Sequence, residues 1–126
     1  MTLVLDAGAL LAIERRDRDL LLALHDEREA GRAARTHGGV IGQVWRGGGP
    51  RQASLAKALH GLEVRPLDVA LGKQAGELLV RTRGRDVVDA ALVLLAQPGD
   101  TIATSDPEDI AVLVAATGRD IEIVVV

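Results

Sequence analysis

The chain has 126 residues, enough for one domain with its own core, and 48% of them are apolar, as in an ordinary soluble globular protein. It has no cysteine, which excludes disulfide bonds and thiolate metal sites. The net charge of −3 excludes a basic field over the whole surface, and a single Trp with no Phe or Tyr argues against base recognition by aromatic stacking. The sequence contains no signal peptide or membrane-spanning run, so we expect a cytoplasmic protein with no membrane partner.

Short apolar runs alternate with amphipathic stretches along the chain. In chain order, the pattern predicts a strand at 2–5, helices at 6–14 and 19–30, a strand at 35–37, and a short helix or turn at 39–46. It then predicts helices at 50–60, 68–80, 86–96 and 106–117, with strands at 62–67, 101–104 and 120–126. Strands that alternate with helices predict a single α/β domain, residues 1–126, with a parallel sheet.

Three aspartates stand where these elements begin or end. Asp6 follows the first strand, Asp89 lies in the first turn of the helix that begins near Asp86, and Asp106 follows the strand at 101–104. Ligand sites of open parallel sheets lie beyond the carboxyl ends of the strands, so a pocket that draws on all three is geometrically reasonable. Carboxylates a few ångströms apart repel one another unless a cation neutralises them. Such a pocket calls for a divalent metal with oxygen ligands, which can activate a water and stabilise charge on a phosphate.

Each of these aspartates also has a simpler explanation. Asp6 and Asp106 are suited to cap the helices that follow them, and Asp86 with Asp89 can form a capping arrangement. For any one residue taken alone, capping and metal binding remain open.

The ordered set of motifs resembles a known family. The segments Asp6-Ala-Gly-Ala-Leu, Asp89-Ala-Ala-Leu-Val-Leu-Leu-Ala and Ala103-Thr-Ser-Asp106 resemble the acidic motifs of PIN domains, above all those of VapC-type toxins of toxin–antitoxin pairs. The resemblance covers essentially the whole chain. It implies a three-layer α/β/α fold with a five-stranded parallel sheet, and cleavage of RNA that depends on Mg²⁺ or Mn²⁺ held by Asp6, Asp89 and Asp106. It also implies a cognate antitoxin and a homodimer.

One position departs from the family pattern. The family usually has a Glu on the helix after the second strand, and Gln43 holds that place here. An amide brings an oxygen but no charge, so metal affinity should fall, and Asp86 is a candidate to supply the missing charge. Gln43, Arg46 and Arg85 are the candidates for contacts to RNA, although a solvated surface position also explains each arginine.

Three classes of function are compatible with this pattern. The first is a metal-dependent endoribonuclease, and the second is a catalytically weak PIN-like domain that binds RNA or a partner, for which Gln43 is the motive. The third is a phosphotransfer domain of the receiver or haloacid-dehalogenase type, which needs a lysine near the acids. Neither Lys57 nor Lys73 follows a predicted strand end, so this class ranks last.

Overall fold

Five parallel strands form one sheet in the order β3-β2-β1-β4-β5 in the computed structural model, which describes all residues from Met1 to Val126. The strands are β1 (Leu3–Leu5), β2 (Arg35–His37), β3 (Glu63–Arg65), β4 (Thr101–Thr104) and β5 (Glu122–Val125). The chain builds outward from β1 to β3 on one side and then returns to add β4 and β5 on the other. The strand order therefore reverses between β1 and β4, which is where ligands bind in folds of this kind.

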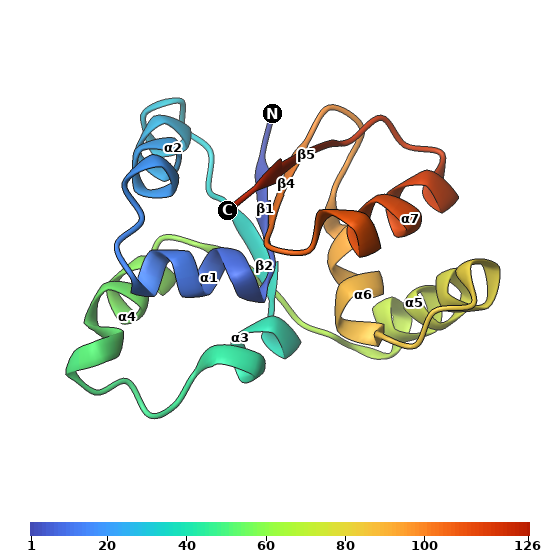
Figure 1. Ribbon diagram of the computed structural model, residues 1–126, viewed down its shortest axis with the longest axis horizontal. Coiled ribbons are helices and arrows are strands. Elements are labelled where there is room, and N and C mark those ends of the chain that lie inside the picture. The colour runs from blue at the N-terminus through green and yellow to red at the C-terminus, as the bar shows by residue number, and fades with distance from the viewer.

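Helices cover both faces of the sheet and give three layers (Figure 1). On one side lie α1 (Ala7–Glu14), α2 (Arg18–Glu29) and α4 (Ala53–Leu59), and on the other lie α5 (Val69–Thr82), α6 (Val87–Leu95) and α7 (Pro107–Thr117). The short helix α3 (Gly38–Val44) packs against both α1 and α6. The expected three-layer α/β/α fold with a five-stranded parallel sheet is confirmed.

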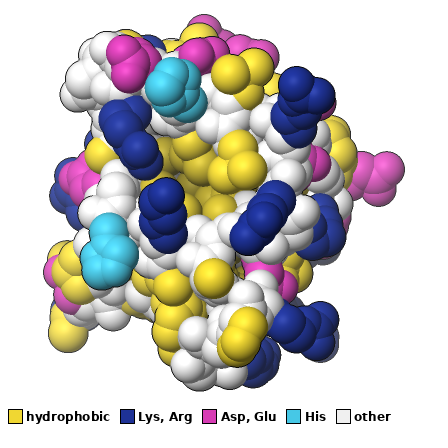
Figure 2. Space-filling model, turned by 90° about the vertical axis from the view of Figure 1, so that its left-hand side faces the viewer, with side chains coloured by type: hydrophobic (Ala, Val, Ile, Leu, Met, Phe, Trp, Pro, Cys, Tyr) yellow, Lys and Arg dark blue, Asp and Glu magenta, His cyan; other side chains and the backbone are white.

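The core is a single cluster of 26 buried hydrophobic residues, with no aromatic side chain among them. The centre of the sheet and α6 provide much of it: β1 is buried along its whole length, and five of the residues of α6 are buried. A helix that is buried on most sides must be apolar nearly all round, which is why Asp89 stands out in α6. On the outer surface of α2 and α4, in contrast, apolar side chains remain open to solvent (Figure 2).

Every predicted strand and helix is present, with ends that differ from the prediction by at most two residues, except at 50–60. There Pro50–Gln52 forms a 3-10 turn, η1, and α4 begins only at Ala53. The buried side-chain amide of Gln52 accepts the backbone N–H groups of Arg46 (2.9 Å) and Gly48 (3.1 Å) and donates to the carbonyl of Val44 (2.9 Å). These bonds hold Gln52 at φ −106° and ψ 13°, outside helical geometry, so the prediction of one continuous helix is wrong.

None of the helices could cross a lipid bilayer, because the longest, α5, has 14 residues and a span needs about 20 apolar ones.

Candidate functional site

Asp6 lies directly after β1 and is only 5% exposed. Its backbone N–H donates to the carbonyl of Ala103 (3.3 Å), which joins it to β4, and its Oδ1 accepts the N–H of Ala9 (2.8 Å), which caps α1. Its Oδ2 makes no hydrogen bond within the protein. Every fully buried side-chain oxygen of the protein does have a hydrogen-bond partner, so Oδ2 must be accessible to solvent. Asp6 therefore caps a helix with one oxygen and leaves the other free.

Asp106 follows β4 and precedes α7, but its carboxylate caps nothing. Its backbone N–H donates to Oγ1 of Thr104 (2.8 Å), and its side chain accepts no backbone N–H from the first turn of α7. The aspartates that precede α1, α2, α5 and α6 all cap through a side-chain oxygen, so Asp106 is the exception among them. Its exposed carboxylate is free to serve another purpose.

Asp89 lies close to the negative charges carried by the other two segments. It lies half-buried in the first turn of α6, and its N–H donates to Oδ1 of the capping residue Asp86 (3.0 Å). Burial and then the negative charges of Asp86, Asp6 and Asp106, together with a hydrogen bond to Asp86, raise the pKa of Asp89 to about 7. We call Asp6, Asp86, Asp89 and Asp106 the acidic cluster. It joins the aspartates that follow β1 and β4 to the two at the start of α6.

Asp109, an exposed residue in the first turn of α7, extends the cluster toward solvent. Its pKa is raised by a hydrogen bond to Asp106 and by the charge of that residue. Asp109 also lines, with Arg85, Asp86 and Asp89, a cavity of about 240 Å³ between α5, α6 and α7. In the sequence, the spacing of Asp106 and Asp109, one helical turn apart, could have indicated that Asp109 lies beside the cluster.

The donor set of the cluster fits a hard divalent cation, because every group is a carboxylate. No three of the side chains are placed closely enough to hold a metal ion in their present positions. Binding would therefore need a side chain to rotate, and Asp106 is exposed and has no helix cap to give up, although its bond to Asp109 would have to change. Asp86, by contrast, is held by its bond to the N–H of Asp89.

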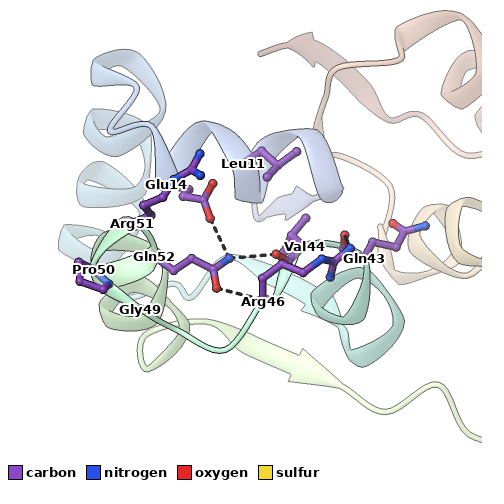
Figure 3. A pocket seen from close by; sticks show the side chains of 9 residues that line it. All are labelled: Leu11, Glu14, Gln43, Val44, Arg46, Gly49, Pro50, Arg51 and Gln52. Atoms are coloured by element: carbon purple, nitrogen blue, oxygen red, sulfur yellow. Dashed lines mark hydrogen bonds between the residues drawn. The ribbon is translucent and has the colours of Figure 1, made fainter.

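Gln43 and Arg46 line a different cavity, of about 470 Å³, with Glu14, Arg51 and Gln52 (Figure 3). The guanidinium of Arg46 donates to the carbonyls of Gly42 (3.3 Å), Gln43 (3.1 Å) and Trp45 (2.6 Å), and so it closes the carboxyl end of α3. Gln43 is exposed, and Figure 3 shows its side chain directed away from Gln52. Of the three candidates for RNA contacts, the structure thus brings only Arg85 to the cavity that Asp89 lines.

A buried histidine connects the helix of Gln43 to the helix of Asp89. Nδ1 of His37 accepts the N–H of Gly39 (3.1 Å) at the start of α3, and Nε2 lies 2.9 Å from the carbonyl of Val88 in α6. Burial lowers the pKa of His37, which favours the neutral ring with its proton on Nε2. His37 thereby fixes the start of α3 beside Val88, the residue that precedes Asp89.

The raised pKa of Asp89 predicts a pH-dependent cost to stability. Because the folded pKa of about 7 lies above the ordinary value near 3.9, the stability that Asp89 contributes is fully present below about pH 4 and is lost as the pH rises through about 7. Asp89→Asn should therefore melt at a higher temperature than the wild type at pH 8 without metal, and at nearly the same temperature at pH 4. Asp68→Asn, which removes a carboxylate outside the cluster, is the control in thermal unfolding followed by circular dichroism. An equal change of melting temperature at pH 8 in both variants would contradict this account.

No protein-family profile matches the chain, and no curated protein matches it in sequence. Among solved structures, it is similar to the crystal structure of VapBC2 from Rickettsia felis bound to a DNA fragment from their promoter. The TM-score is 0.67 at 14% sequence identity, over 98% of this chain and 99% of that chain. The likeness is one of fold, and it confirms the PIN-like fold that the acidic motifs implied.

Proposed function

We propose that the protein is a Mg²⁺- or Mn²⁺-dependent endoribonuclease and the toxin of a toxin–antitoxin pair. The observation that carries the proposal is the convergence on Asp89 of negative charge from Asp6, Asp86 and Asp106, at the point where the strand order reverses. A half-buried carboxyl with a pKa near 7 is stabilised when a cation replaces its proton. The likeness in fold to a chain of a VapBC2 structure supports the same function.

Asp6, Asp89 and Asp106 would hold the ion, with Asp86 adding negative charge beside them. A bound divalent ion supplies Lewis acidity and a water of lowered pKa at the phosphodiester. Asp6 is fixed for this task by its hydrogen bond to Ala9, which leaves Oδ2 free. Arg85 lines the same cavity as Asp86 and Asp89, where a guanidinium can bind a phosphate oxygen of RNA.

The alternative is a PIN-like domain that binds RNA or a partner without cutting, and Gln43 is the residue that favours it. Gln43 is not among the groups that perturb Asp89, and it makes no side-chain hydrogen bond within the protein. Asp86 raises the pKa of Asp89, and Asp106 raises the pKa of Asp109, so Asp86 and Asp109 bring negative charge to the cluster that offsets the charge that Gln43 lacks. This additional negative charge favours the nuclease over the domain that only binds.

Removing a cluster carboxylate should abolish both metal binding and cleavage. We expect Asp6→Asn and Asp106→Asn to lose Mn²⁺ binding in calorimetry and to lose cleavage of a broad RNA pool, which EDTA should also stop in the wild type. Asn at position 6 can still cap α1, so folding should survive. Asp68→Asn should keep both activities. If the wild type leaves the RNA pool intact across metals, the binding-domain alternative replaces the nuclease.

Gln43→Glu tests whether the departure from the family pattern limits the metal. Residue 43 lies outside the cavity of Asp89, so the substitution acts on the metal only if its side chain turns toward the acidic cluster. In that case the added carboxylate should tighten Mn²⁺ binding by up to about tenfold, or 1.4 kcal/mol, and the gain in activity should shrink in saturating Mn²⁺. If Asp86 has instead become a ligand, Gln43→Glu changes little and Asp86→Asn weakens binding strongly. Titration of Mn²⁺ into both variants separates the two. Unchanged affinity in both would leave only Asp6, Asp89 and Asp106 as ligands.

The proposed antitoxin needs a surface on which to bind, and the groove between α2 and α4 has suitable chemistry. Two adjoining cavities of about 490 and 330 Å³ run along it and share Leu24, Arg28 and Ala58. Apolar side chains form its floor, with Leu21 37% exposed, and cationic side chains stand around it (Figure 2). Arg28 and Lys57 at the rim form no ion pair within the protein, and neither does Arg16.

The positive charge around the groove favours a partner with acidic side chains. Although the whole chain carries −3, the rim of this groove is positive, so an apolar partner with acidic flanks complements it. A groove between two helices fits an amphipathic helix, whose apolar stripe would lie on Leu21 and Leu24. We infer an acidic amphipathic helix of the antitoxin as the occupant. The homodimer implied by the family resemblance stays a separate prediction.

Two charge changes at the groove test this assignment. Leu21→Glu and Lys57→Glu should each weaken binding to the cognate antitoxin by at least about tenfold, because Leu21→Glu opposes the apolar stripe and Lys57→Glu opposes the acidic flank. Val80→Glu, on the exposed face of α5, is the control for an added carboxylate. Co-purification and calorimetry give the readout. Binding that falls with Val80→Glu and not with Leu21→Glu would place the partner elsewhere.

A further inference from the structure

The first turn of α1 lies against the loop between β4 and α7 more closely than a side chain would allow. A Cβ atom on Gly8 would overlap Oγ of Ser105 and lie 2.5 Å from its Cβ and 3.0 Å from its backbone nitrogen. The φ angle of Gly8 is not in the left-handed region, so its backbone could accommodate any residue. Space alone requires glycine here, because the hydroxyl of Ser105 occupies the place of a side chain at position 8.

This contact lies between two carboxylates of the acidic cluster. Gly8 is two residues after Asp6, and Ser105 directly precedes Asp106. The last backbone hydrogen bond between the two segments is from Asp6 to the carbonyl of Ala103. Beyond it the sheet no longer sets their separation, and the packing of Ser105 on Gly8 is the next constraint.

Packing alone holds Ser105 in place. Its side chain is exposed and forms no hydrogen bond within the protein, whereas the neighbouring Thr104 hydroxyl is bound to the N–H of Asp106. A larger residue at position 8 would push the loop outward at Ser105, and the adjacent Asp106 would move with it. Because no three carboxylates are yet close enough for a metal ion, a further separation would be costly.

We propose that Gly8 and Ser105 are a pair of positioning residues that sets the separation of Asp6 and Asp106, and with it the affinity of the acidic cluster for a divalent cation. The effect on affinity rests on the proposed function, whereas the effect on loop position does not. Neither residue needs to touch the ion, since each acts through the carboxylate beside it.

Three variants and a control test the pair. Gly8→Ala should weaken Mn²⁺ binding in calorimetry by at least about tenfold, the scale on which residues that support metal ligands act. Ser105→Gly should bind nearly as the wild type does. In the double variant Gly8→Ala/Ser105→Gly, the overlap with the serine side chain is gone, so affinity should return to within about threefold of Ser105→Gly. Gly76→Ala, where an added Cβ meets nothing within 4 Å in α5, should leave binding unchanged.

A second readout without metal separates this proposal from the proposed function. Backbone amide chemical shifts of residues 104–107 should move in Gly8→Ala and return in the double variant, with thermal unfolding confirming that both are folded. Unmoved shifts and unchanged Mn²⁺ affinity in Gly8→Ala would overturn the proposal, and so would a loss that Ser105→Gly does not rescue. A further outcome is that the wild type binds no Mn²⁺ while the chemical shifts move in Gly8→Ala and return in the double variant. That result would contradict the proposed metal site and would support the effect of Gly8 and Ser105 on the position of the loop.

Discussion

Parallel pairing of β1 with β4 is the interaction on which the candidate site depends. Leu5 pairs with Ala103, so Asp6 and Asp106 leave the sheet side by side although 100 residues separate them in sequence. The pairing is stabilised from both faces, since β1 and β4 are entirely buried and α1 and α6 pack on β1. The helix α6 then brings Asp86 and Asp89 to the same edge. The acidic cluster therefore exists only when β1 and β4 have paired and α6 has packed beside them.

Helix capping and metal binding, which compete as explanations of each aspartate, are compatible in the structure. A carboxylate has two oxygens, and Asp6 uses one to cap α1 while the other reaches solvent. The cap fixes the side chain in one orientation, which is the property that a ligand needs. Asp86 caps α6 in the same manner and raises the pKa of Asp89. Asp106 is the one that caps no helix, and its side chain bonds instead to Asp109 in the first turn of α7.

Much of this architecture could be predicted from sequence because it depends on local patterns. Apolar periodicity and capping residues locate the helices and strands. Asp6 and Asp106 are recognised as acids that follow strands, and Asp89 as an acid in the first turn of an apolar helix. The details that escaped prediction depend on tertiary contacts. Arg46 turns back onto the carbonyls of α3, and Gly47 and Gly48 adopt φ values of 92° and 70° beside it, which no periodicity reveals.

Other tertiary features were equally hidden. The side-chain amide of Gln52 breaks the helix at 50–60 through bonds to residues on the preceding loop. His37 reaches Val88 across the molecule, and Ser105 fills the space beside Gly8. The contacts of His37 and Ser105 join segments far apart in sequence, and both reach elements that carry residues of the acidic cluster.

The most direct test of the central claim is a crystal structure of the protein soaked in Mn²⁺, with anomalous scattering recorded at the manganese edge. The account predicts a peak bounded by Oδ2 of Asp6 and the carboxylates of Asp89 and Asp106, with the Asp106 side chain rotated toward Asp6. A fully occupied peak elsewhere, or none at this edge of the sheet in saturating Mn²⁺, would contradict it.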